Sequence, residues 1–63
     1  MAAVKVREAL RLITVAGWYW VRTTGSHRHY KHPVRPGLVT IPGKPGDDLS
    51  PKTWESIRRQ AGL

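Results

Sequence analysis

Apolar residues recur every three or four positions along the first part of the chain. The repeat is formed by Val6, Ala9, Leu10, Ile13 and Ala16. This spacing places them on one face of a helix, while the charged residues between them point elsewhere. Gly17 follows at the position where helices often end, because glycine readily adopts the left-handed backbone of a C-terminal cap. The pattern predicts a helix over residues 4–16.

Strand composition follows this helix. Residues 18–24 are almost all aromatic, β-branched or threonine, which is typical of a strand. Gly25 and Ser26 suit the two central positions of a type II′ turn, whose first position needs a positive φ. The chain is then expected to return as a second strand over residues 27–32, and a short third strand is expected over residues 38–41.

A second helix is predicted near the end of the sequence. A loop with several Pro and Gly residues spans residues 42–48. Ser50 suits the N-cap and Pro51 the first helical position, and Gly62 ends the pattern. The order is therefore helix, three strands, helix. We expect a single α+β domain over residues 1–63, with both helices on one face of a three-stranded antiparallel sheet.

A chain of 63 residues has a thin core, because a domain this small buries only about 60% of its unfolded surface. We expect Trp18, Trp20 and Trp54 to supply much of it. The absence of cysteine excludes disulfides, Cys-based zinc fingers and thiol nucleophiles. It suits a reducing compartment, so a cytoplasmic protein is expected. No apolar run approaches the roughly 18 residues of a membrane span, so a membrane-spanning protein is not expected.

The two-residue turn fixes the expected pairing of the hairpin. The predicted cross-strand pairs are Thr24 with His27, Arg22 with His29, Val21 with Tyr30, and Trp20 with Lys31. Alternation then sorts the side chains into two faces. The face expected beneath the helices carries Tyr19, Val21 and Tyr30, with Thr23, Arg28 and His32 toward its ends. The open face is expected to carry Trp18, Trp20, Arg22, His27, His29 and Lys31. Cations interleaved with aromatics suit RNA, although a solvated basic face is the plainer interpretation.

Charge points to an anionic partner. Eleven Lys and Arg residues against four acids give a net charge of +7, and each cation that neutralises a phosphate releases a counterion. Nucleic acid is the first candidate partner and an acidic protein the second. An anionic membrane surface comes third, because no predicted helix combines a basic face with a broad apolar one, and no membrane partner is expected. The acids are Glu8, Asp47, Asp48 and Glu55. A two-metal nuclease needs several converging carboxylates, and a glycosidase needs a separated pair of them. Four acids at these positions argue against both classes of enzyme.

His27 is the sharpest candidate for chemistry, because it follows a tight turn at the start of a strand. Imidazole ordinarily titrates near neutral pH and can take or give a proton there. RNA carries its own nucleophile, the 2′-OH. A single imidazole that transfers a proton is therefore nearly all that its cleavage needs from the protein. Arg22, Arg28 or Lys31 could stabilise the charge that develops on the phosphate. The alternative is that His27 is an ordinary polar surface residue.

A metal site is not expected. His27 and His29 share a face at a spacing that suits a shared metal ion. His32 has the wrong parity to join them, and the carboxylates are distant in sequence. We therefore expect neither a metal nor a cofactor.

The sequence resembles the HicA family of toxin mRNA interferases. The resemblance is carried by Gly17-Trp18, Val21-Arg22, Gly25-Ser26-His27, Tyr30-Lys31-His32-Pro33, Pro42-Gly43, Pro45-Gly46-Asp47-Asp48-Leu49, Thr53, Ile57 and Gln60-Ala61-Gly62. It implies an α-β-β-β-α fold like that of double-stranded-RNA-binding domains. It also implies ribosome-independent cleavage of RNA, with the family's catalytic histidine at His27. The implied partner is a HicB antitoxin that covers the active site, in a bacterial or archaeal cytoplasm.

The resulting hypothesis is a metal-independent endoribonuclease toxin with His27 as the acid or base. The expected RNA-binding residues are Arg22, Ser26, Arg28 and Lys31. The second hypothesis is a non-catalytic RNA-binding module in which His27 contacts a phosphate or a base. The third is an interaction module for an acidic protein, which would show no salt-dependent affinity for RNA.

Overall fold

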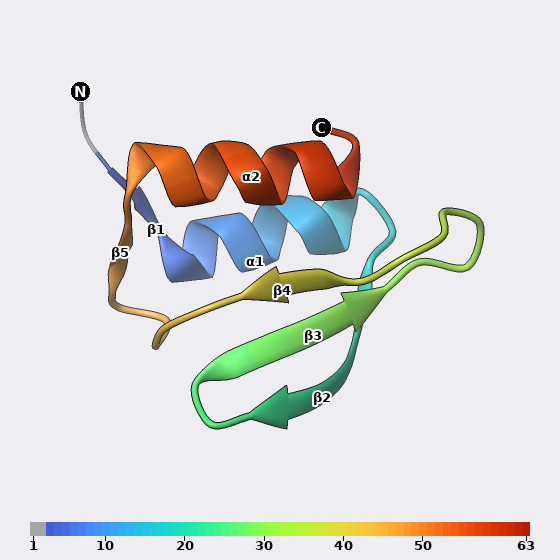
Figure 1. Ribbon diagram of the computed structural model, residues 1–63, viewed down its shortest axis with the longest axis horizontal. Coiled ribbons are helices and arrows are strands. Elements are labelled where there is room, and N and C mark those ends of the chain that lie inside the picture. Colours follow the sequence, from blue (N-terminus) through green and yellow to red (C-terminus); the bar gives the residue numbers. More distant parts are fainter. Residues whose placement is uncertain (1–2) are drawn as a thin grey trace.

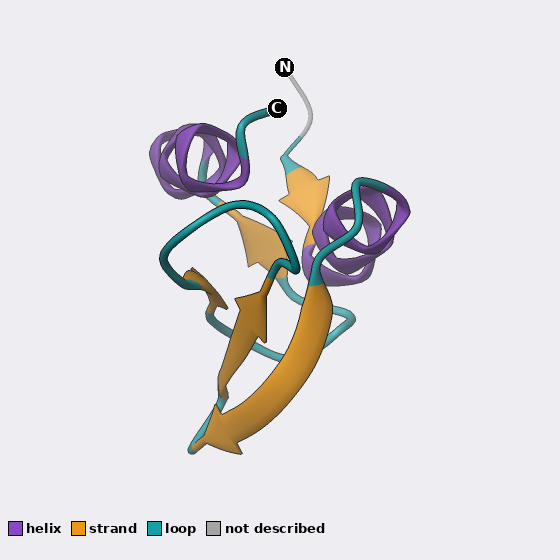
Figure 2. Ribbon diagram, turned by 90° about the vertical axis from the view of Figure 1, so that its right-hand side faces the viewer, coloured by secondary structure: helices purple, strands orange, loops and turns teal. Residues whose placement is uncertain are grey.

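Two helices pack on the same side of a three-stranded antiparallel sheet in the computed structural model, which describes residues 3–63 (Figure 1, Figure 2). The elements are β1 (Val4–Lys5), α1 (Val6–Val15), β2 (Tyr19–Thr24), β3 (His27–Lys31), β4 (Val39–Ile41), β5 (Asp48–Leu49) and α2 (Pro51–Ala61). The sheet order is β2-β3-β4, with β3 in the middle. The α+β class and the order of the main elements are confirmed. Met1 and Ala2 of the expected domain lie outside the described residues.

The first helix begins two residues later than predicted, because residues 4 and 5 pair with a distant segment. Val4 pairs with Leu49, and Lys5 pairs with Asp48, as the short antiparallel strands β1 and β5. The Lys5 ammonium also lies 2.9 Å from the Asp48 carboxylate. This contact spans most of the chain, so a local pattern of apolar residues could not predict it.

The loop before β5 also holds the start of α1. The helix has no side-chain cap at its N-terminus. Instead, the amide of Val6 donates to the carbonyl of Asp47 at 2.9 Å, and the amide of Arg7 donates to that of Pro45 at 3.0 Å. Backbone carbonyls thus satisfy two of the amides that a helix leaves unpaired at its first turn.

Helix α1 ends before Gly17, as predicted, and it ends there for the predicted reason, the backbone conformation of glycine. Gly17 has a φ of +102°, a conformation that disfavours residues with a side chain. A Cβ there would also lie 2.7 Å from Nε2 of His32. Backbone strain and the close histidine both restrict this position to glycine.

The predicted boundaries of α2 are confirmed as well. The Ser50 hydroxyl accepts a hydrogen bond from the amide of Thr53 at 3.1 Å, as an N-cap should. Pro51 occupies the first turn, and Gly62 closes the helix in the left-handed conformation. Within residues 3–63, neither helix is long and apolar enough to cross a bilayer.

The turn between β2 and β3 forms as predicted. Gly25 has a φ of +59°, whereas Ser26 does not adopt a positive φ, the combination that a type II′ turn requires. Two of the predicted pairs nearest the turn are confirmed, Thr24 with His27 and Arg22 with His29. The start of β3 is therefore held in register by a tight hairpin.

A β-bulge at Val21 changes the register farther from the turn. The observed pairs are Trp20 with Tyr30 and Tyr19 with Lys31. The predicted pairs of Val21 with Tyr30 and of Trp20 with Lys31 are therefore wrong. The extra residue in β2 moves every preceding side chain to the opposite face of the sheet.

The faces of Tyr19 and Trp20 are consequently exchanged. Directly paired residues share a face, so Tyr19 lies with Lys31 on the open face. Trp20 lies with Tyr30 on the helix side, but at the uncovered edge of the sheet, and 57% of it is exposed. Trp20 therefore does not contribute to the buried core as predicted.

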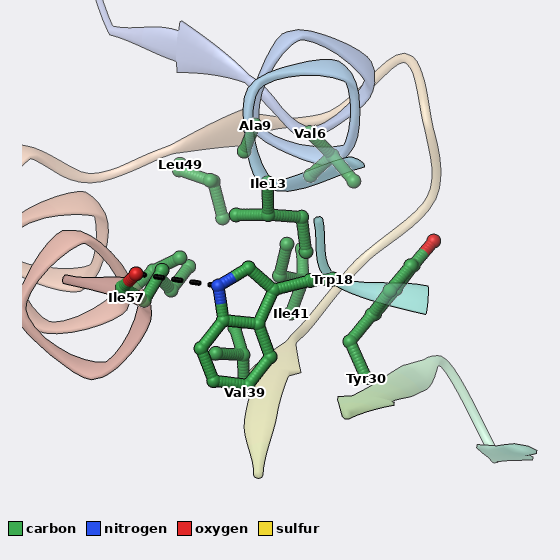
Figure 3. Packing of buried hydrophobic residues seen from close by; sticks show 10 residues of the cluster. Val6, Ala9, Ile13, Trp18, Tyr30, Val39, Ile41, Leu49 and Ile57 are labelled. Atoms are coloured by element: carbon green, nitrogen blue, oxygen red, sulfur yellow. Dashed lines mark hydrogen bonds between the residues drawn. The ribbon is translucent and has the colours of Figure 1, made fainter. Parts of the chain in front are cut away.

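Trp18 is buried, with 2% of its surface exposed, so the prediction that it lies on the open face is wrong. Strand β2 begins after it, at Tyr19, and the alternation of the strand does not apply to it. Its indole N–H donates to the carbonyl of Ala61 at 3.2 Å (Figure 3). Trp54 packs against the core but is only partly buried.

The core lies between the helices and one face of the sheet (Figure 3). Its buried members are Val6, Ala9, Ile13, Trp18, Tyr30, Val39, Ile41, Leu49, Ile57 and Ala61. Every main element except β2 contributes to it. Helices α1 and α2 are therefore held in place by the same apolar contacts that seat the central strand.

His32 joins the core to the loop after β3. Its ring packs edge-on against Trp18, with centroids 5.2 Å apart. Its Nδ1 accepts hydrogen bonds from the amides of Val34 at 3.0 Å and Arg35 at 3.1 Å. The proton is therefore on Nε2, which donates to the carbonyl of Ala16 at 3.1 Å. This histidine of the Lys-His-Pro motif holds the loop in place.

We predict that Trp18→Phe strongly destabilises the fold. It removes the hydrogen bond to Ala61 and leaves part of a buried volume empty. The expected loss is about 2–3 kcal/mol, out of a total of roughly 3–9 kcal/mol for a domain of this size. Urea unfolding followed by circular dichroism measures it. The control Trp20→Phe, at an exposed position, should cost less than about 1 kcal/mol, and equal losses would contradict the assignment.

We also predict a loss of stability at alkaline pH that depends on Tyr30. Burial raises the pKa of its phenol, an effect that nearby Arg28 partly offsets. The unfolded chain therefore releases this proton first, and the free energy of unfolding falls as pH rises above the ordinary tyrosine pKa of about 10. Denaturation at pH 8 and pH 11 should show a smaller loss for Tyr30→Phe than for the native chain. The control Tyr19→Phe should behave like the native chain.

Candidate active site

His27 is the first residue of β3 and follows the hairpin turn directly. Its side chain is exposed. Its cross-strand partner is Thr24, and the two share the open face of the sheet. A tight turn and a paired strand leave the backbone here little freedom. The imidazole is therefore presented to solvent from a fixed position.

A groove of about 560 Å³ opens beside His27, between the sheet and α2. Residues from the sheet side are His27, Thr40 and Pro42, and those from α2 and its cap are Ser50, Lys52, Thr53, Ser56, Ile57, Arg59 and Gln60. The α2 helix runs above β4, so one wall of the groove is helical (Figure 1). Eight of the ten lining residues carry polar side chains, and Ile57 is the buried apolar residue beneath them.

The α2 wall of the groove contributes two cations that the sequence analysis missed. Lys52, Ser56 and Arg59 are spaced four and three residues apart, which places them on one face of the helix. Among the described residues that line the groove, none is acidic. The polar face of α2 is visible in the sequence. What the sequence does not reveal is that this face lies opposite His27.

The open face of the sheet carries the second group of cations. Arg22 pairs with His29, and Tyr19 pairs with Lys31, so all four side chains lie on the same face as His27. Lys31 is four residues from His27 along β3, a distance of about 13 Å in an extended strand. The structure thus places Arg22 and Lys31 on the predicted face, but Lys31 lies at the opposite end of β3 from His27.

His29 is held by a neighbouring strand. Its Nδ1 lies 3.1 Å from the hydroxyl of Thr40, and the histidine is half-buried. Thr40 also lines the groove. Within residues 3–63, no three His, Cys, Asp or Glu side chains gather in an arrangement that could hold a metal ion.

Arg28 lies on the side of the sheet that faces the helices. It pairs with Ile41, whose side chain is fully buried. Its Nη1 donates to the carbonyl of Gly43 at 2.8 Å, and the side chain is half-buried. Arg28 therefore links β3 to the loop after β4. Ser26, by contrast, is exposed in the turn beside His27.

The groove has the chemical groups for general acid or base catalysis on a phosphodiester. His27 supplies an imidazole that can accept or donate a proton. Lys52 and Arg59 supply positive charge along the same groove, where it can stabilise an anionic substrate or transition state. The residues come from two rigid elements that the core holds together. This geometry allows a reacting group to be positioned against His27.

Comparisons with known proteins agree with the fold and the motifs. A family model described as the HicA toxin of bacterial toxin-antitoxin matches residues 6–63. A solved chain described as belonging to a toxin-antitoxin complex from Streptococcus pneumoniae is 32% identical, with a TM-score of 0.78. The alignment covers 94% of this chain and 97% of that chain. No curated protein matches the sequence.

We predict that Arg28→Gln destabilises the fold, because it removes a charged donor from a half-buried carbonyl. The expected loss in the free energy of unfolding is about 1–2 kcal/mol. Urea unfolding measures it. Arg22→Gln removes the same charge from an exposed position and should cost less than about 0.5 kcal/mol. If both variants unfold alike, the hydrogen bond to Gly43 does not stabilise the fold.

Proposed function

This chain belongs to the HicA toxin family, and from that premise we propose that it is an endoribonuclease whose catalytic residue is His27. It is the toxin of a type II toxin-antitoxin system, and its family consists generally of mRNA interferases. The observation that carries the proposal is the position of His27. An exposed imidazole, fixed by a tight hairpin, opens onto a groove with two cations and no acid among its described residues.

The proposed reaction uses the substrate's own nucleophile. The 2′-oxygen attacks the adjacent phosphorus, a 2′-O–P bond forms, and the bond from phosphorus to the 5′-oxygen breaks. The 2′-OH loses its proton and the departing 5′-oxygen gains one. His27 either takes the first proton or gives the second, and such assistance is worth about 10²–10⁴ in rate. The products are a 2′,3′-cyclic phosphate and a 5′-hydroxyl end.

No metal ion is required for this proposed reaction, because the substrate supplies the nucleophile and His27 handles a proton. We include Arg22, Ser26 and Lys31 as RNA-contacting residues, since all three are exposed. Their exposure on or beside the face that carries His27 supports this. Arg28 is the weakest member of the predicted set, because its guanidinium is committed to Gly43.

The proposed partner is an antitoxin of the HicB type, which would bind the toxin and cover the groove. The support is that the similar chain from Streptococcus pneumoniae belongs to a toxin-antitoxin complex. The excess of positive charge on this chain suits an acidic partner as well as RNA. Both partners would be met in the bacterial cytoplasm.

One observation favours a non-catalytic RNA-binding module as the second candidate. Among the described residues that line the groove, His27 is the one imidazole or carboxylate. A reaction that transfers two protons would then have a single protein group to assist it. If water cannot serve for the other proton, the groove would bind RNA without cleaving it.

We predict that the native chain cleaves RNA in excess EDTA and that His27→Ala abolishes cleavage. The loss should be at least about 10²-fold, because the variant lacks the proton-transfer group. Gel analysis of a labelled RNA, with chemical analysis of the fragment ends, measures the rate and the products. RNA affinity should be roughly retained.

The control for this prediction is His29→Gln, which removes a neighbouring histidine from the same strand and should still cleave. All variants must first show a native circular dichroism spectrum. Equal cleavage by native and His27→Ala samples would overturn the assignment of His27. Products with 3′-hydroxyl and 5′-phosphate ends would overturn the proposed chemistry. Binding without cleavage by the native chain would favour the second candidate.

A further inference from the structure

We propose that the face of α2 that carries Lys52 and Arg59 is the phosphate-binding wall of the RNA site. The two cations would grip the substrate strand on the helical side of the groove, while His27 acts from the sheet side. This inference rests on the proposed function, because it assigns the RNA grip beside the cleavage site. It adds binding residues from a helix to those expected on the sheet.

The first argument is shared position. Lys52 and Arg59 line the same groove as His27, whereas Lys31 lies about 13 Å away along β3. The two α2 residues are separated by seven positions, which is a rise of about 10 Å on one helical face. A strand that lies along the groove would therefore meet a cation at two separate points.

The second argument is the pairing of charges elsewhere in the molecule. Three of the four acids form ion pairs away from the groove: Asp48 with Lys5, Glu8 with Arg11, and Glu55 with Arg58. Lys52 and Arg59 take part in none of the ion pairs found within residues 3–63. Both are exposed. Their charge is therefore available to an anionic ligand, and neutralising phosphates there would release counterions.

Glu55 illustrates this separation within α2 itself. Its carboxylate accepts hydrogen bonds from Arg58 at 2.9 Å, although it lies on the same helix as the two groove cations. It is not among the residues that line the groove. The helix thus pairs its acid outside the groove and turns unpaired cations toward it. This arrangement favours an anion in the groove.

The third argument is that the wall is rigid and continuous with the open face of the sheet. Ile57, on the inner side of α2, is 2% exposed and packs in the core. Thr40 belongs to the open face through its pairing with His29, and it also lines the groove. RNA bound across Arg22 and Lys31 can therefore pass over the edge of the sheet at Thr40 and enter the α2 groove.

The test compares two double variants of the full chain. Lys52→Gln with Arg59→Gln removes two cations from the groove face of α2. Arg7→Gln with Arg11→Gln removes the same net charge from α1 and is the control for net charge. Both doubles are made in the His27→Ala background, so that RNA is not consumed. A labelled single-stranded RNA is then titrated at several salt concentrations, after circular dichroism confirms the fold.

We expect the α2 variant to reduce the slope of log affinity against log salt by about 1.4, because each phosphate contact to a single strand contributes about 0.7. Its affinity at the lowest salt should fall roughly tenfold. The α1 control should change both quantities much less. Lys52→Arg with Arg59→Lys keeps both charges and should restore the native slope.

Equal effects of the α1 and α2 doubles would overturn the inference, because they would show a response to net charge alone. An unchanged slope in the α2 double would also overturn it. With His27 present, the α2 double should raise the KM for cleavage more than it lowers kcat. Failure of the native chain to cleave would defeat the proposed function instead, and the binding experiment would still decide the role of α2.

Discussion

The buried indole of Trp18 fixes the arrangement on which the rest of the structure depends. It follows α1, lies in the core between the helices and the sheet, and donates its N–H to the carbonyl of Ala61 in the last turn of α2. One side chain therefore ties both helices to the start of the hairpin. Ile57 and Ala61 add apolar contacts from α2 to the same core. Because a domain of this size has a thin core, the position of the groove wall opposite His27 depends on this small set of contacts, of which the Trp18 hydrogen bond is one.

The hairpin contributes the other half of the site. Its strands pair in the predicted register near the turn but in a shifted register farther from it. Near the turn, Gly25 enforces the register and presents His27 at the start of β3. Farther away, the bulge at Val21 shifts the pairing and exchanges the faces of Tyr19 and Trp20. The irregularity therefore alters the edge of the sheet and leaves the end that carries His27 unchanged. The pairing is thus regular at the end of the hairpin where we propose that the chemistry takes place.

Local chemistry made much of the fold predictable, and non-local contacts explain what was missed. Caps at Ser50 and Gly62, the stop at Gly17 and the turn at Gly25 act within a few residues, so the sequence reveals them. The pairing of β1 with β5 joins segments more than forty residues apart, and the bulge depends on packing that no pattern of alternation encodes. In the same way, the Gly25-Ser26-His27 motif identifies His27 from the sequence. The position of α2 across the groove from His27 arises only when the chain folds, so the sequence does not reveal it.

The chemistry proposed for this chain also explains why so small a domain suffices. An enzyme that must activate water or hold metal ions needs several converging groups and a second layer of residues to orient them. RNA carries its own nucleophile at every nucleotide, so the protein needs to hold the strand and move protons. Holding an anion requires surface cations, which a thin core can support. One well-placed imidazole can transfer one of the two protons, and water can serve for the other. In the proposed site, a hairpin that fixes His27 and a helix that carries Lys52 and Arg59 would provide these functions without a deep cavity.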